Sequence, residues 1–97
     1  MFEIEFSADA IEDLKWFRKP DQVAIRDAIE TNFRHQPDLQ TKNRKELREG
    51  HVSEWELRVD KARVFYDVDV EAAVVSIVAV GYKERSRLYF RGEERTP

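Results

Sequence analysis

The sequence predicts an α+β fold: an N-terminal strand, then a two-helix antiparallel hairpin packed on a mainly antiparallel sheet of four to five strands. Three observations support this prediction: an alternating run at the start, two amphipathic stretches after it, and three strand-like runs between Trp55 and Tyr89. With 97 residues, of which 41% are hydrophobic, the chain can fill one core and not two. We therefore predict a single domain over residues 1–90 and a flexible C-terminal tail at residues 91–97, where apolar periodicity is lost.

The N-terminal part predicts one strand and two helices. Residues 2–6 alternate apolar with acidic side chains, which is typical of a half-buried strand. Ser7 can cap a helix in which apolar residues recur at helical spacing, at Ala10, Ile11, Leu14 and Phe17. Pro20 interrupts this helix, because proline disfavours the helical conformation of the residue before it. A second helix is expected from about Asp21 to His35, and Pro37 stops it.

Three runs in the C-terminal half predict strands that pair as neighbours. Apolar and polar residues alternate through Trp55–Val59 and again through Val64–Val68, whereas residues 72–80 are almost all apolar. This order indicates an edge strand, a middle strand and a most buried strand. Hairpin turns are expected at Asp60–Lys61 and at Asp69–Glu71, although neither contains glycine.

Composition excludes several classes of protein. The chain has no cysteine and two histidines, so disulfides and thiolate metal sites are excluded. Its longest apolar run is about nine residues, against the roughly 20 that a membrane-spanning helix needs. The N-terminus lacks the basic and then apolar pattern of a signal peptide. We therefore expect a cytoplasmic protein that does not insert into membranes.

The net charge of −3 hides a gradient along the chain. Acids come first, at Glu3, Glu5, Asp9, Glu12, Asp13, Asp21, Asp27 and Glu30. A basic loop follows them, and its cations fall within seven residues, at Lys42, Arg44, Lys45 and Arg48. We expect a short strand around Glu46 and Leu47 in this loop. Folding would place an acidic helical side opposite a more basic sheet side, which suits a protein that presents one face to a polyanion.

Several short motifs follow one another along the predicted strands. They are Lys45-Glu46-Leu47-Arg48-Glu49-Gly50, Trp55-Glu56-Leu57-Arg58-Val59, Arg63-Val64-Phe65-Tyr66, Val80-Gly81-Tyr82-Lys83-Glu84-Arg85-Ser86 and Leu88-Tyr89. Their order and spacing resemble the RelE/ParE family of small bacterial toxins, in which the first motif has the form Lys-Leu-x-Gly. The resemblance spans Phe6 to Phe90 and implies a RelE/ParE toxin-like fold.

The resemblance also implies a function. Family members are toxins of type II systems, each held inactive by an antitoxin protein, through which the toxin mainly oligomerises. RelE-type members enter the ribosomal decoding site and cut messenger RNA by 2′-hydroxyl attack on the adjacent phosphate, without a metal or cofactor. ParE-type members share the fold and inhibit DNA gyrase, so fold alone does not choose between the two activities. We predict a ribosome-dependent messenger RNA endonuclease, with two alternatives: a gyrase inhibitor, or a degenerate toxin that only binds its antitoxin.

Three residues match the family's site for RNA cleavage. Arg63 matches the arginine that binds the scissile phosphate, where a guanidinium can contact two oxygens at once. Lys83 stands where the ribonucleases usually have an arginine, and Arg85 is a close alternative for that role. Tyr89 matches a tyrosine that stacks on or hydrogen-bonds the substrate nucleotide. Two of them also have a structural interpretation. Arg63 could pair with Asp67 or a neighbouring glutamate on the surface, and Tyr89 could pack against Trp55 or Phe90.

The main departure from the family lies at Glu54 and Glu56, where the best-studied RelE branch has two lysines proposed for acid–base chemistry. Either carboxylate could act as general base for the 2′-hydroxyl. The alternative, which we favour on sequence alone, is two solvated acids on the exposed face of an edge strand. His51, just before this strand, is a further candidate base or an ordinary surface residue.

The remaining cations are candidates for binding substrate by charge, at Arg58 and in the basic loop at Lys42, Arg44, Lys45 and Arg48. They could contact ribosomal RNA, or they could solvate the loop and receive an acidic antitoxin.

Overall fold

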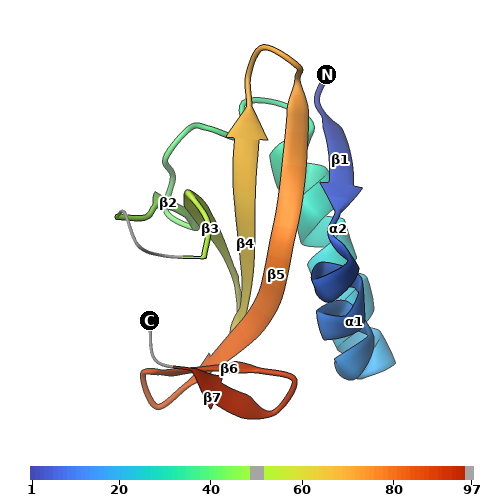
Figure 1. Ribbon diagram of the computed structural model, residues 1–97, viewed down its shortest axis with the longest axis vertical. Coiled ribbons are helices and arrows are strands. Elements are labelled where there is room, and N and C mark those ends of the chain that lie inside the picture. Colours follow the sequence, from blue (N-terminus) through green and yellow to red (C-terminus); the bar gives the residue numbers. More distant parts are fainter. Residues whose placement is uncertain (49–51, 96–97) are drawn as a thin grey trace.

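The computed structural model describes residues 1–48 and 52–95, which form two helices and a seven-stranded sheet (Figure 1). The elements in chain order are β1 Glu3–Phe6, α1 Ala8–Trp16, α2 Lys19–Phe33, β2 Arg44–Glu46, β3 Trp55–Val59, β4 Ala62–Asp69, β5 Val74–Glu84, β6 Arg87–Phe90 and β7 Glu93–Arg95. The predicted α+β class is confirmed. The short strand expected around Glu46 and Leu47 lies slightly earlier, as β2. The sheet has more strands than the expected four or five because β6 and β7 were not predicted.

The start of α1 follows its predicted cap, whereas α2 starts earlier than expected. The hydroxyl of Ser7 accepts a hydrogen bond from the backbone N–H of Ala10 at 3.0 Å, which caps α1. The break before Pro20 is confirmed, but α2 starts two residues earlier than expected, at Lys19. Proline is tolerated in the first turn of a helix because the N–H that it lacks would have no partner there. Neither helix in the described part is long and apolar enough to cross a membrane.

The strands are ordered β2-β3-β4-β5-β6-β7 in the sheet, and all of these neighbours pair antiparallel. β1 lies outside this path and pairs parallel with the first half of β5. β6 pairs with the last residues of β5 and continues into the hairpin β6–β7, which lies across the lower end of the sheet in Figure 1. β3 is therefore not the edge strand that the sequence predicts, because β2 pairs with its outer side.

The core lies between the helices and one face of the sheet. Its most buried side chains are Leu14, Ile25, Ile29, Phe33, Leu57, Val64, Tyr66, Val75, Ile77 and Val80. Tyr66 is fully buried, and its hydroxyl donates to the carbonyl of Pro37 at 3.0 Å. Because neighbouring side chains of a strand point to opposite faces, the residues between these positions point to the face without helices. We call this second face the open face.

Tight turns explain the strands that the sequence did not predict. The expected hairpin turn at Asp60–Lys61 joins β3 to β4. Two further two-residue turns, Arg85–Ser86 and Arg91–Gly92, have positive φ at both positions, which matches the twist of hairpin strands. Residues 93–95, which lie in the expected tail, form β7 instead. Strand pairing there depends on backbone hydrogen bonds and needs no apolar side chains, so the sequence pattern does not reveal it.

Candidate functional site

The open face carries a groove of about 610 Å³ between β2 and the hairpin β6–β7, which we call the open-face groove. It is lined by Lys45, Glu46, Leu47, Arg48, Glu56, Phe65, Lys83, Ser86, Arg87, Leu88, Glu94 and Arg95. Five of these side chains are cations and three are carboxylates. The groove is therefore locally cationic in a protein whose net charge is −3.

Glu56 lies on the floor of the open-face groove. It sits on β3 between two core residues, opposite Lys45 of β2 and Phe65 of β4. Only 8% of its surface is exposed, so the prediction of a solvated acid on an edge strand is wrong for this residue. Within the described residues, none of the four ion pairs includes Glu56. Its carboxylate therefore lines the groove together with five cations, and none of the described cations forms an ion pair with it.

Glu54 has a different environment, although it is only two residues away. It precedes β3 and is exposed, and its backbone N–H donates to Asp67 Oδ1 at 2.7 Å. Here the interpretation as a solvated acid agrees with the structure. His51, the third candidate base, lies outside the described residues. Burial therefore distinguishes the two carboxylates that the sequence left equivalent.

Lys83 and Arg63 both belong to the open face, but only Lys83 lines the groove. Arg63 pairs opposite Gly81 on β5, and its Nη1 donates to the carbonyls of Asp60 at 2.7 Å and Ala62 at 2.8 Å. Burial lowers the pKa of the Arg63 guanidinium from its ordinary value, and the nearby Glu56 carboxylate opposes this shift. The predicted alternative of a surface ion pair between Arg63 and Asp67 is not formed among the described residues.

Tyr89 lies on the opposite face of the sheet from Lys83. It pairs with Tyr82, and the two rings stack with centroids 5.2 Å apart. Tyr82 in turn stacks on Trp16 of α1, also at 5.2 Å. Because the phase of β6 is fixed by the turn before it, Leu88 faces the groove and Tyr89 faces the helices. The three residues that match the family's cleavage site are therefore not gathered in one cavity.

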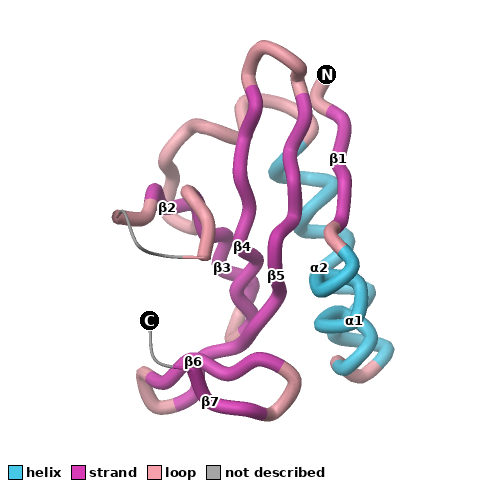
Figure 2. The backbone as a smooth tube through the Cα atoms, viewed as in Figure 1, coloured by secondary structure: helices cyan, strands magenta, loops and turns pink. Residues whose placement is uncertain are grey.

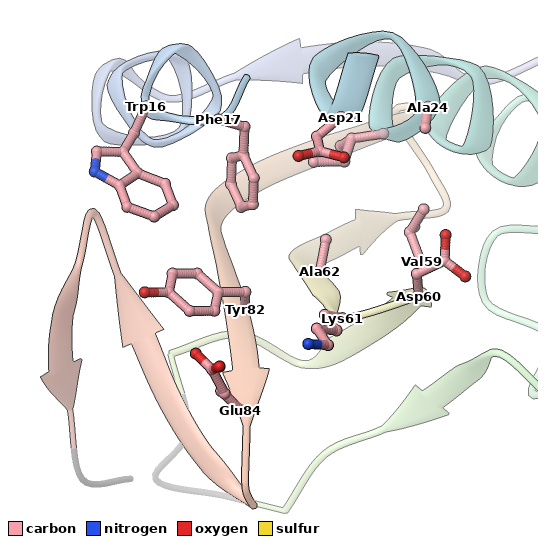
Figure 3. A pocket seen from close by; sticks show the side chains of 11 residues that line it. Trp16, Phe17, Asp21, Ala24, Val59, Asp60, Lys61, Ala62, Tyr82 and Glu84 are labelled. Atoms are coloured by element: carbon pink, nitrogen blue, oxygen red, sulfur yellow. The ribbon is translucent and has the colours of Figure 1, made fainter. Parts of the chain in front are cut away.

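A second groove, of about 550 Å³, lies on the helix side of the sheet, and Figure 3 shows the side chains that line it. Trp16 and Phe17 project toward Tyr82 across one end of this helix-side groove (Figure 3). Charged residues join the apolar walls: Asp21, Asp60, Lys61 and Glu84. Three of these four are acids, so the two grooves differ in charge as well as in position.

The cations predicted to bind substrate fall into three groups: those that line the open-face groove, those that are exposed outside it, and Arg44, which is buried. Lys45 and Arg48 line the open-face groove. Lys42, Arg58 and Arg85 are exposed and lie outside it.

Arg44 does not fit the prediction that it binds substrate, because its side chain is buried on the helix side. Its Nη1 donates to the carbonyls of Asn32 at 3.0 Å and Gln36 at 2.8 Å. Arg44 thereby ties the end of α2 to the loop that leads into β2.

Sequence reasoning missed three residues. Arg87 and Arg95 line the groove, and the only signal for them was their alternation in two very short strands. Asp13 is 3% exposed, although it was expected among the acids of an acidic helical side. Its position three residues after Ala10 places it on the buried stripe of α1, and this spacing was visible in the sequence. No group of three possible metal ligands occurs within residues 1–48 and 52–95.

Comparison with known proteins identifies relatives of this chain. Residues 4–87 match the family described as the ParE toxin of the type II toxin-antitoxin system, parDE. The fold is similar to a chain in the toxin-antitoxin complex RelBE2 from Mycobacterium tuberculosis, with a TM-score of 0.72 and 20% identity over 84% of this chain and 98% of that chain. It is also similar to a chain in the archaeal RelE-RelB complex from Pyrococcus horikoshii OT3, with a TM-score of 0.63 and 20% identity over 87% of this chain and 97% of that chain. No curated protein sequence gives a significant match.

Proposed function

The chain belongs to the RelE/ParE family and is the toxin component of a type II toxin–antitoxin system, and on this basis we propose that it cleaves messenger RNA on the ribosome with the open-face groove. The observation that supports this activity is the largely buried side chain of Glu56, which lines a groove with five cations and forms no ion pair among the described residues. RNA is a polyanion, and a local excess of positive charge attracts it independently of the net charge of the protein.

In the proposed reaction Glu56 acts as the general base. Its carboxylate takes the proton of the substrate's 2′-hydroxyl, and the resulting oxygen attacks the adjacent phosphorus. The bond from phosphorus to the 5′-oxygen breaks, which leaves a 2′,3′-cyclic phosphate and a 5′-hydroxyl. The ammonium group of Lys83 supplies the proton for the leaving oxygen. The chain's own residues therefore account for both proton transfers.

Cations of the groove stabilise the charge that develops on the phosphate. Lys45 faces Glu56 across the β2–β3 pair, and Lys83 lines the same cavity. A pentavalent phosphate carries more negative charge than the bound substrate, so cations placed beforehand stabilise the transition state more than the ground state. Arg63 lies outside the cavity and contributes as a fixed charge on the same face, because the carbonyls of Asp60 and Ala62 hold its guanidinium.

The test compares two substitutions in neighbouring acids, Glu56→Gln and Glu54→Gln. In a reconstituted translation reaction, Glu56→Gln is expected to slow message cleavage by about 10²- to 10⁴-fold, which is the usual effect of losing a general base. Glu54→Gln is the matched control and is expected to cleave at the rate of the unsubstituted protein. Equal rates for all three proteins would remove Glu56 from the mechanism. No cleavage by the unsubstituted protein with ribosomes present would remove the ribonuclease activity itself.

The position of Tyr89 favours a second candidate, inhibition of DNA gyrase. Tyr89 stacks on Tyr82 on the helix side, and Arg63 does not line the groove. A protein that inhibits by binding its target needs no catalytic cluster, so this separation is compatible with a gyrase inhibitor. A supercoiling assay with purified gyrase tests this candidate, and undisturbed supercoiling at excess toxin would exclude it.

We also propose a cognate antitoxin as the protein partner, since both similar folds come from toxin–antitoxin complexes. Co-expression with the product of the neighbouring reading frame should yield a stable complex and should suppress growth arrest. A neighbouring product that neither binds the chain nor relieves its toxicity would contradict the pairing.

A further inference from the structure

The edge of β5 changes partners along its length. β1 pairs with its first part, up to Ile77, and β6 pairs with its last part, from Tyr82. Figure 2 shows β1 beside the upper half of β5 and the hairpin β6–β7 at its lower end. Between the two lies a stretch of this edge that no strand of the described residues covers.

Helix α1 and its N-cap residue, Ser7, cover that stretch with two polar side chains. The hydroxyl of Ser7 donates to the carbonyl of Val78 at 2.8 Å. Oδ2 of Asp13 accepts the backbone N–H of Val80 at 3.0 Å. The edge groups are thereby satisfied by side chains in place of a strand, as buried backbone groups require.

The second carboxylate oxygen of Asp13 reaches a different element. Arg91 Nε lies 3.0 Å from Asp13 Oδ1, and Arg91 occupies the two-residue turn between β6 and β7. Asp13 therefore contacts β5 with one oxygen and the tip of the hairpin with the other. Trp16, one turn further along α1, lies against Gly92 of the same turn. These contacts attach the hairpin to the helix on the side of the sheet away from the open-face groove.

The hairpin held in this way forms one wall of the groove. It contributes Arg87, Leu88, Glu94 and Arg95 to the lining. The opposite wall comes from residues 45–48, on and after β2. The contacts of Asp13 described above reach β5 and the hairpin, and not this wall. The distance between the two walls consequently depends on where the hairpin is fixed.

The burial of Asp13 is unfavourable for its charged form. Only 3% of its surface is exposed, and this burial raises the pKa of its carboxyl above the ordinary value, while the Val80 N–H and Arg91 oppose the shift. A buried carboxylate whose partners do not fully offset its desolvation contributes little to stability. Because Asp13 contacts both β5 and the turn of the hairpin β6–β7, it is instead suited to fixing the hairpin relative to the sheet.

We propose that Asp13 is a positioning residue, which fixes the hairpin β6–β7 against α1 through Arg91 and so sets the width of the open-face groove for RNA. The part of this inference that concerns RNA rests on the proposed function. The part that concerns the hairpin does not, and the two can be measured separately.

Hydrogen exchange measures the attachment of the hairpin directly. Asp13→Asn keeps an oxygen for the Val80 N–H but removes the charge that holds Arg91, and Arg91→Gln removes the same contact from the other side. A hydrogen bond between charged groups is strong enough that its loss should speed exchange of the β6–β7 amides roughly tenfold or more, while core amides of β4 exchange as before. The double variant should add little to either single one, because both break one contact.

Asp9→Asn is the matched control. Asp9 is also on α1, but its side chain is 83% exposed and 3.9 Å from Arg91. It is expected to leave hairpin exchange unchanged. Unchanged exchange in Asp13→Asn and Arg91→Gln, or an acceleration spread evenly over the core, would overturn the positioning role. An even acceleration would mean that the pair contributes only to global stability.

Message cleavage tests the link to RNA. Displacement of a site wall by about 1 Å commonly slows catalysis by up to roughly 100-fold, so both variants should cleave roughly 10- to 100-fold more slowly than the Asp9→Asn control. A loosened hairpin with undiminished cleavage would overturn the role in groove width. If the unsubstituted protein cleaves no message, the proposed function fails, and hydrogen exchange still decides whether Asp13 fixes the hairpin.

Discussion

Replacing Gly81 by alanine should displace the hairpin β6–β7 through a backbone clash. Gly81 lies on β5 directly before the residues that pair with β6, and a Cβ at this position would lie 2.6 Å from the carbonyl oxygen of Tyr89. It would also lie 2.9 Å from Cε1 of Phe90. The phenyl ring can rotate away, whereas the carbonyl belongs to the backbone of β6. The strand itself therefore has to move.

The expected loss of stability is about 1–2 kcal/mol. Overpacking a well-packed site costs typically about 1–3 kcal/mol. Alanine also restricts the unfolded chain, which returns roughly 0.4–1 kcal/mol. In a domain of this size each kcal/mol lowers the melting temperature by about 4–8 °C. The substitution should thus lower the melting temperature by at least several degrees.

Urea unfolding of Gly81→Ala and of Ser76→Ala measures this difference. Ser76 is exposed on the same strand, and its substitution should change the free energy of unfolding by less than about 0.5 kcal/mol. Adding Phe90→Leu to Gly81→Ala removes the contact with the ring and leaves the contact with the carbonyl. Recovery of full stability in that double variant would refute the backbone clash, as would a Gly81→Ala protein as stable as the Ser76→Ala control.

Two further predictions concern buried polar groups. Tyr66→Phe removes the hydroxyl that donates to the carbonyl of Pro37 at 3.0 Å. It should lower the free energy of unfolding by about 1–3 kcal/mol, measured by urea titration. An unchanged unfolding midpoint would contradict the importance of this hydrogen bond. Asp13 lies near Asp9, Arg91 and Arg95, and burial raises the pKa of its carboxyl. The contribution of Asp13 to stability is therefore fully present below the ordinary aspartate pKa and is lost as pH rises through the raised pKa. Unfolding free energies between acid and neutral pH should therefore shift in favour of Asp13→Asn as pH rises, and a shift in the opposite direction would contradict the raised pKa.

The sequence was informative about the fold where side chains pack and uninformative where only backbone groups pair. The helices and the three central strands carry apolar periodicity, and their order was predicted correctly. β2 and β7 are short and mostly exposed, so no periodicity marks them. The turn at Arg91–Gly92 offered a signal, because a glycine in a two-residue turn is typical of hairpins. Without apolar residues beside it, this signal was interpreted as part of a tail.

The candidate site was harder to predict, because it depends on which face each residue occupies. A shift of one residue in register moves every side chain of a strand to the other face. The two-residue turn at Arg85–Ser86 sets this phase for β6, so that Leu88 faces the groove and Tyr89 the helices. The residue types of a site can thus be proposed from sequence, whereas their assembly depends on turns far shorter than any periodic pattern.

The two glutamates show why charge alone does not decide whether a site is active. A carboxylate close to a phosphate opposes binding by roughly 1 to 4 kcal/mol, depending on the effective dielectric constant. Glu54 is exposed and forms no ion pair among the described residues, whereas Glu56 lies in a groove where cations outnumber carboxylates by five to three. Under the proposed mechanism the cations bring RNA to the groove, and the carboxylate that they surround accepts the proton. In this mechanism the roles proposed for the family's two lysines are taken by other residues: Lys45 and Lys83 supply positive charge, Lys83 also donates the proton, and Glu56 is the base.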